Sequence, residues 1–181
     1  MVLDGPDLFV QDSGDCTDGG DGDTGSVTEL SASTGRLVRV LGVAADQFEA
    51  PDAMVLDGPD LFVANSGGFA GLNNSVTELN ASTGVLVKVL SAYQSDTAMV
   101  VDGPHLFLAN GGSVTEVDAS TGAPVMGIGA SPYQFNTPDA MVLDGPDLFV
   151  ANNAGSSTGE RSWYGGSLLM TTERAAALGY P

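Results

Sequence analysis

Residues 53–90 read AMVLDGPDLFVANSGGFAGLNNSVTELNASTGVLVKVL, and this stretch decides the fold because it recurs along most of the chain. Its opening block, MVLDGPDLFV or close to it, begins at Met1, Met54, Met99 and Met141. A second block, SVTEL or SVTEV followed by AST and Gly, begins at Ser26, Ser75 and Ser113. Self-similarity at a period of roughly 40–50 residues is typical of four-stranded propeller blades.

Within one repeat, turn residues separate four short apolar segments, which we name strands a to d. The expected strands are Met54–Asp57, Leu61–Asn65, Ser75–Leu79 and Val85–Leu90. Gly58 and Pro59 interrupt the first two, because these residues are the strongest breakers of extended structure. The AST-Gly segment separates the last two with residues that favour tight turns. Several short strands at regular spacing indicate an all-β fold.

Strand d carries apolar residues on both faces, with Val85, Val87 and Val89 on one and Leu86 and Leu90 on the other. Such a pattern favours a sheet packed between two neighbouring sheets. Helical repeats need an apolar period of 3.6 residues, which these segments lack. Leucine-rich repeats are shorter, at roughly 20–29 residues.

We therefore predict an all-β β-propeller of four-stranded blades, with three full repeats and a partial fourth. The repeats span residues 1–50, 51–95, 96–137 and, in part, 138–152. Residues 153–181 form a divergent C-terminal tail, in which residues 166–172 are a candidate substitute for strand c. Propellers typically have 4–8 blades. The sequence accordingly predicts either a four-bladed ring or an incomplete array, whose open Val- and Leu-rich edge would favour self-association.

The composition is strongly acidic, with 23 Asp and Glu against five Lys and Arg and a net charge of −18. Nucleic-acid binding needs a cationic surface that displaces counterions from phosphates, so the charge argues against it. No apolar segment approaches the roughly 20 residues of a membrane span. The charge favours solubility and attraction for cations or basic partners.

Met1 begins in the middle of a repeat, with no charged and apolar leader before it, so we expect no signal peptide in this sequence. Two readings stay open, a chain that truly starts at a strand and a piece of a longer repeat array.

The connections between strands differ in how much they vary. The b–c and d–a loops change in length from repeat to repeat, whereas the a–b and c–d turns hardly change. In a four-stranded meander the two variable loops emerge at one end of the strands and the two turns at the other. Repeat proteins commonly place their insertions on the binding face. Neutral drift in loop length is the alternative explanation.

The acidic b–c loop of the first repeat is the candidate metal site. Its aspartates, set among glycines, are Asp15, Asp18, Asp21 and Asp23, with Asp12 just before them. Ca²⁺ takes six to eight oxygen ligands, which such a loop can supply. The loop meets neither the EF-hand pattern nor the calcium-binding nonapeptide. A solvated Asp/Gly insertion is the competing interpretation.

Three further groups have both a functional and a structural interpretation. Asn65, Asn110 and Asn152 occupy one repeat position, with Gln11 in the first repeat and Asp52 and Asp139 nearby; they either ring a ligand or satisfy local backbone bonds. The aromatic residues Phe48, Tyr93, Tyr133 and Phe135 in the d–a loops either stack on a ligand or wedge between blades. His105 replaces the aspartate of the other a–b turns, and we expect a surface substitution rather than a catalytic base.

The motif PDAMVLDGPDLFVAN at residues 51–65, with NSVTELNASTGVLVKVL at 74–90, resembles the YVTN and NHL-type β-propeller repeats of bacterial proteins. The resemblance covers roughly residues 1–152 and implies an extracellular or cell-envelope location. Propellers of this kind include metal-dependent lactonases and lyases, which hold a divalent cation on the central axis with Glu, Asn and Asp. No such ligand set transfers to this sequence residue by residue.

The sequence favours a non-catalytic propeller module that binds a partner or ligand through the b–c and d–a loops, because its repeats are nearly uniform. The alternative is a fragment of a metal-dependent propeller enzyme of the lactonase or lyase type. An axial cluster of carboxylate and amide side chains would distinguish the enzyme from the binding module.

Overall fold

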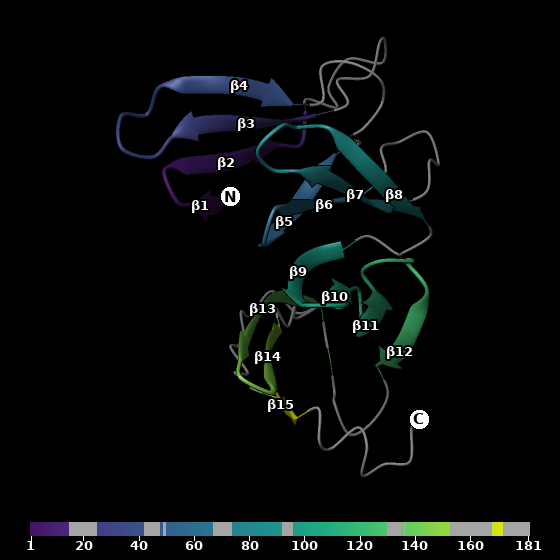
Figure 1. The fold of residues 1–181 in the computed structure, drawn as a ribbon. Helices are drawn as coiled ribbons and strands as arrows, with labels where there is room; N and C mark the ends of the chain where they lie inside the picture. Colours follow the sequence, from purple (N-terminus) through teal and green to yellow (C-terminus); the bar gives the residue numbers. More distant parts are fainter. Residues whose placement is uncertain are drawn as a thin grey trace. The chain divides into compact units, whose positions relative to one another are not determined.

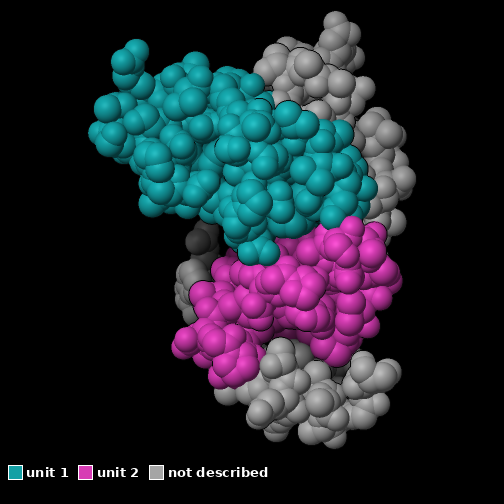
Figure 2. Space-filling view, viewed as in Figure 1, with its two compact units in different colours: residues 1–96 teal, residues 97–181 magenta. Residues whose placement is uncertain are grey.

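The structure, a computed structural model, describes residues 1–14, 25–41, 48, 50–66, 74–91, 96–129, 135, 137–152 and 168–171. The described residues form fifteen β-strands and no helix (Figure 1). The chain divides into two compact units, Met1–Asp96 and Thr97–Pro181 (Figure 2). No helix in the described part of the chain is long and apolar enough to cross a membrane.

The strands form four antiparallel sheets in chain order, three of four strands and one of three. The first sheet contains β1 (Val2–Asp4), β2 (Asp7–Asp12), β3 (Ser26–Ser31) and β4 (Leu37–Leu41). The second contains β5 (Pro51–Asp57), β6 (Asp60–Asn65), β7 (Ser75–Asn80) and β8 (Leu86–Ser91). The third contains β9 (Asp96–Asp102), β10 (His105–Asn110), β11 (Ser113–Asp118) and β12 (Pro124–Ile128). The fourth contains β13 (Pro138–Asp144), β14 (Asp147–Asn152) and β15 (Leu168–Thr171). The predicted all-β fold of four-stranded blades is confirmed.

The a–b turn of each sheet is a two-residue hairpin. In the second sheet Asp57 pairs with Asp60, so Gly58 and Pro59 alone form the loop. Gly58 has a φ of 55°, a conformation that residues with a Cβ atom rarely adopt. A positive φ at the first loop position belongs to the type II′ turn, whose twist matches that of the flanking strands. The repeated DGP sequence therefore sets the register of strands a and b.

Each c–d turn is tied to the a–b turn of its own sheet. The amide of Ala81 donates to the carbonyl of Pro59 at 2.7 Å. The first and third sheets repeat this bond from Ala32 to Pro6 and from Ala119 to Pro104, at 2.7 and 2.8 Å. We call this end of each sheet, formed by the a–b and c–d turns, the constant end, and the opposite end the variable end.

The core of each unit lies between its sheets, on strands b and c. In the first unit it contains Phe9 and Val27 from the first sheet, Leu61 and Leu79 from the second, and Phe48 from the d–a loop. In the second unit Phe135 occupies the equivalent place in a cluster with Phe107 and Leu148. Phe48 and Phe135 are buried in these clusters, which favours the packing interpretation for them, while Tyr93 and Tyr133 lie outside the described residues.

Strand d differs from the prediction. We expected its two apolar faces to be covered by neighbouring sheets, but Val85, Val87 and Val89 are 62%, 51% and 47% exposed. Leu90 is buried, whereas Leu86 is 39% exposed. The reason is that β4, β8 and β12 are each the last strand of their sheets, with hydrogen-bonded neighbours on one side.

The third strand of the fourth sheet comes from the predicted tail. β15 pairs antiparallel with β14, and Leu169 lies opposite Phe149. The residues expected to replace strand c therefore do so. At the place where the other sheets carry a glutamate, opposite the strand b phenylalanine, the fourth sheet has this leucine.

Candidate functional site

The variable end of the first unit is built where the first two sheets meet. A Cβ atom on Gly25 would lie 2.5 Å from Cδ of Pro51 and 2.6 Å from the backbone oxygen of Asp12. Gly25 also has a φ of 81°, so both its space and its backbone require glycine. The end of the acidic b–c loop is thus pressed against the start of β5, and Asp12 lies beside it.

Gln11 ties the same two sheets together. Its Nε2 atom donates to the backbone oxygen of Asp52 at 2.8 Å. This bond joins the end of strand b in the first sheet to the start of strand a in the second. Gln11 is therefore occupied in holding the variable end, and its amide is a structural group.

The d–a loops reach strand a through an unusual backbone conformation. Ala50 and Thr137, at the same repeat position, have φ values of 50° and 52°. Both precede a proline, and positive φ is rare for any residue other than glycine, above all for β-branched threonine. Ser66 holds the first corner, since its amide and its Oγ both donate to the carbonyl of Ala50 at 3.1 Å.

The same corner geometry in these two repeats places an aspartate at an exposed position. Asp52 and Asp139 follow the two prolines, and both are exposed. Asp12 is also exposed, at the start of the first b–c loop. The charged side chains of the described variable ends of the first, second and fourth sheets are thus all acidic.

The side chains of the strand b asparagines form hydrogen bonds within their own sheets. Asn65 is buried, and its Nδ2 donates to Oγ1 of Thr77 at 3.0 Å and to Oγ of Ser75 at 3.3 Å. Asn110 is also buried; it donates to Oγ1 of Thr115 at 3.4 Å and accepts a bond from Ser113 Oγ. Asn65 also bonds to the Val63 and Ser75 carbonyls, as the structural interpretation expects, whereas the bonds of Asn110 go to side-chain hydroxyls rather than to the backbone.

The candidate calcium ligands Asp15, Asp18, Asp21 and Asp23 lie outside the described residues. The described flanks of their loop end in an Asx turn, in which the amide of Gly14 donates to Oδ1 of Asp12 at 3.1 Å. Calcium binding there stays a prediction, which a calcium titration by calorimetry tests. Among the described residues no group of three or more His, Cys, Asp or Glu side chains is placed to hold a metal ion.

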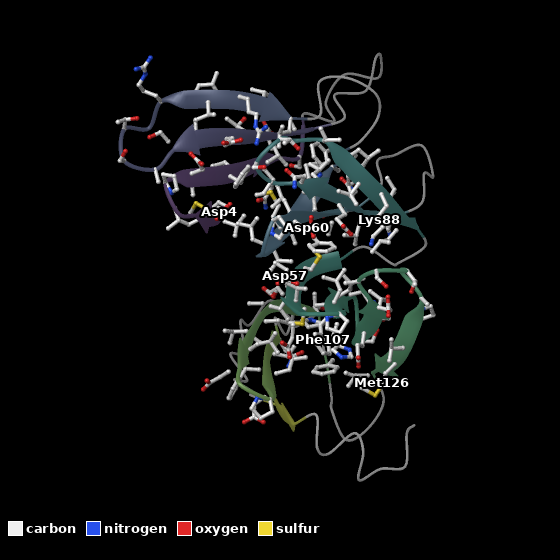
Figure 3. All side chains as sticks on the ribbon, viewed as in Figure 1. Asp4, Asp57, Asp60, Lys88, Phe107 and Met126 are labelled. Carbon is white, nitrogen blue, oxygen red and sulfur yellow. The ribbon has the colours of Figure 1, made fainter. Side chains whose placement is uncertain are left out.

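A feature that sequence reasoning missed is a buried glutamate in strand c of each four-stranded sheet. Glu29, Glu78 and Glu116 are all buried. Glu29 forms an ion pair with Arg39, which lies directly opposite on β4. Lys88 lies opposite Glu78 on β8, with its Nζ 2.9 Å from Oε2 (Figure 3). That oxygen makes no well-directed hydrogen bond, so the contact with Lys88 is mainly electrostatic.

In the third sheet the buried glutamate has a different kind of partner. The residue opposite Glu116 is Met126, which has no charge (Figure 3). Instead Nδ1 of His105, on the strand on the other side, lies 2.7 Å from Oε1 of Glu116. His105 is exposed, as expected of a surface substitution, but its ring nitrogen lies within hydrogen-bonding distance of a buried carboxylate, so it has a structural role that the sequence did not suggest. The signal in the sequence was the coincidence of His105 and Met126 in one repeat.

Arg39 also connects the first two sheets. Its guanidinium donates to the carbonyl of Ala81, in the c–d turn of the second sheet. A Cβ atom on Gly84, in the same turn, would lie 2.5 Å from Cδ2 of Leu41. The ion pairs are thus parts of the packing within and between blades, and nothing in them marks a reaction centre.

Comparison with known proteins bears on the fold. No known protein family and no curated protein matches the sequence. Among solved structures, the chain is similar to the Dos1 propeller, with a TM-score of 0.60 and 12% identity over 80% of this chain and 36% of that one. It is similar to the WD40 domain of Neurospora crassa Pan2, with a TM-score of 0.55 and 14% identity over 81% and 42% of the two chains.

The computationally designed protein Ika4 matches over 81% of this chain and 79% of its own length, with a TM-score of 0.55 and 14% identity. The chain spans about two fifths of the Dos1 and Pan2 chains and most of Ika4. At these identities the likeness concerns the fold alone, and it identifies the chain as a set of β-propeller repeats.

Proposed function

We propose that this chain is a non-catalytic β-propeller repeat module of the YVTN/NHL type that binds a cationic partner through its variable ends. The proposal includes an extracellular or cell-envelope location, which rests on the resemblance of residues 51–65 and 74–90. The observation that carries the binding role is the pair of strained corners at Ala50 and Thr137, which present Asp52 and Asp139 to solvent.

Backbone strain supports a binding role for this end. A non-glycine residue in the left-handed region costs about 1–3 kcal/mol, and such residues cluster at ligand clamps and switch regions. The constant end has no equivalent strain among its described non-glycine residues, since its positive φ angles fall on glycines. The molecule thus stores strain at the end where loop length varies.

Charge supports a cationic partner. Asp12, Asp52 and Asp139 are exposed at the variable ends, and the whole chain has a net charge of −18. A field of one sign accelerates the approach of an oppositely charged partner and disfavours partners of like charge. A basic segment of another protein suits the variable end of either unit better than an acidic or nucleic-acid ligand does.

The test is selection of lysine- and arginine-containing peptides on an array, followed by fluorescence anisotropy with the best binder. Two double variants of equal charge are compared, Asp52→Asn with Asp139→Asn at the variable end and Asp4→Asn with Asp144→Asn at the constant end. We expect the first pair to weaken binding at least roughly tenfold and the second less than about twofold, since close charges dominate over distant ones in salt.

Equal losses in the two double variants would show that the peptide senses only the overall charge, which contradicts a site at the variable end. Failure of every peptide to bind at physiological salt also contradicts the proposal. Circular dichroism of each variant verifies that the fold is retained.

A further inference from the structure

We propose that β8 is a self-association strand, which pairs antiparallel with β8 of a second copy of this chain. β8 is the last strand of its sheet, and no described strand pairs with its outer edge (Figure 1). An exposed edge strand presents a row of backbone donors and acceptors that another chain can use.

The exposed surface of this edge is apolar. Val85, Val87 and Val89 are each about half exposed or more, and Leu86 is 39% exposed. Contiguous apolar surface on a soluble protein commonly marks an interaction site. Burial of these side chains against a second copy would supply the hydrophobic part of the association.

The usual protection of an edge strand is absent from β8. Edge strands are commonly blocked by a lysine or a proline. β8 contains no proline, and its Lys88 is turned onto Glu78 of its own sheet at 2.9 Å. The charge that would repel a pairing strand is therefore neutralised within each copy.

Charge distribution selects a second copy as the partner. The chain carries 23 acidic residues, and two copies repel each other wherever these lie. Residues 85–91 contain no acidic residue. This strip therefore brings no carboxylates together at the contact, and the Lys88 side chains that lie opposite each other there are each paired with Glu78 of their own copy.

The sequence of the strand is self-complementary. Residues 86–90 read Leu-Val-Lys-Val-Leu, which is the same in both directions. An antiparallel pair centred on Lys88 places Leu86 opposite Leu90 and Val87 opposite Val89 of the second copy. A two-fold interface requires this kind of self-matching surface.

The other two outer strands are less suited to this role. β4 has the same pattern, but the c–d turn of the second sheet packs on it through Arg39 and Leu41. β12 begins with Pro124, which has no amide proton to donate, and contains Gly127. Val125 on β12 is 55% exposed and provides a matched control position.

The test is the mass of the full chain by light scattering after size exclusion, over a concentration series. A single strand pair buries less than a standard interface, so we expect an equilibrium in the micromolar range rather than a permanent dimer. The mass should rise from 18.3 kDa toward twice that value. Val89→Asp, which places two carboxylates across the two-fold axis, should abolish the rise, and Val125→Asp should leave it unchanged.

Hydrogen exchange on the unaltered chain tests the same proposal without a variant. Amides of residues 85–91 should exchange at least several-fold more slowly at high than at low protein concentration. A mass that stays at one copy overturns the proposal, as does an association that Val89→Asp and Val125→Asp affect equally. Unchanged exchange of β8 in an associated sample overturns it as well. Peptide binding at the variable end is a separate readout, which Val89→Asp should not alter.

Discussion

The second and third sheets are built on the same register, yet they neutralise a buried carboxylate in opposite ways. Glu78 is paired from strand d by Lys88, and Glu116 is paired from strand b by His105. In both sheets the glutamate lies opposite a phenylalanine of strand b. The comparison teaches that a buried carboxylate at this place can take its nitrogen partner from either neighbouring strand.

The largest expected effect comes from replacing the histidine partner of Glu116 in the third sheet. His105→Asp restores the residue found at this position in the other sheets, but it leaves Glu116 without its hydrogen-bond partner and adds a negative charge nearby. Because His105 is about half exposed, loss of its contact alone should cost about 1 kcal/mol, and the new carboxylate beside the buried Glu116 should raise the loss to about 2 kcal/mol. Urea denaturation, followed by hydrogen exchange of β10 and β11 amides, measures the loss of unfolding free energy.

The decisive control is the double variant His105→Asp with Met126→Lys. It copies the arrangement of the second sheet, so we expect it to recover at least half of the lost stability. Lack of recovery would mean that the pairing of Glu116 depends on features of the third sheet other than a nearby cation, and the comparison would fail.

A somewhat smaller loss is expected from Lys88→Met in the second sheet. The change gives Glu78 the cross-strand neighbour that Glu116 has, without a histidine in strand b, because Asp60 occupies that position. Lys88 is also partly exposed, so solvent screens the pair, and the change adds no negative charge beside Glu78; we therefore expect a smaller loss of about 1 kcal/mol. Adding Asp60→His to Lys88→Met should reverse this loss of stability, as judged by the urea midpoint. Lys88→Arg alone should have little effect on the midpoint.

A smaller change of opposite sign is expected at the corner before β5. The second sheet begins with Pro51 and Asp52 after a strained Ala50, whereas the third begins with Asp96 and Thr97. Ala50→Gly relieves the strain and should stabilise the chain by about 1 kcal/mol. If strain serves binding, the same variant weakens peptide capture. Thermal denaturation and anisotropy measure the two effects, and a destabilised variant would show that Ala50 is not strained.

How far the sequence alone leads differs between these features. The DGP and AST-Gly turns were predictable because Gly, Pro and short polar residues determine local backbone geometry. The exposure of Val87 was not, because alternation does not distinguish an outer strand from an inner one. The pairing of His105 with Glu116 was missed because it depends on a diagonal contact between strands. The positive φ of Ala50 could not be predicted from the sequence, because alanine ordinarily adopts a negative φ.

The smallest expected effect separates the c–d turns of the same two sheets. Asp118 Oδ1 accepts bonds from the Ser120 hydroxyl at 2.6 Å and from the Thr121 amide and hydroxyl at 2.8 and 2.9 Å. These bonds, the Ser120 hydroxyl first, lower the pKa of Asp118 from 3.8 to about 2. Asn80 Oδ1 makes the same bonds in the second sheet without a charge.

A carboxylate with a lowered pKa stabilises the folded state above its unfolded pKa, and this contribution is lost as the pH falls through the folded value. The third turn should therefore weaken between about pH 4 and pH 2, while the second should not. NMR titration of the Asp118 carboxyl carbon, with amide exchange of Gly122 and Gly84, follows both turns. Asp118→Asn should remove the acid dependence and Asn80→Asp should transfer it. A midpoint near pH 4 for Asp118 would show that these hydrogen bonds are not maintained in solution, and that the charged turn gains nothing over the neutral one.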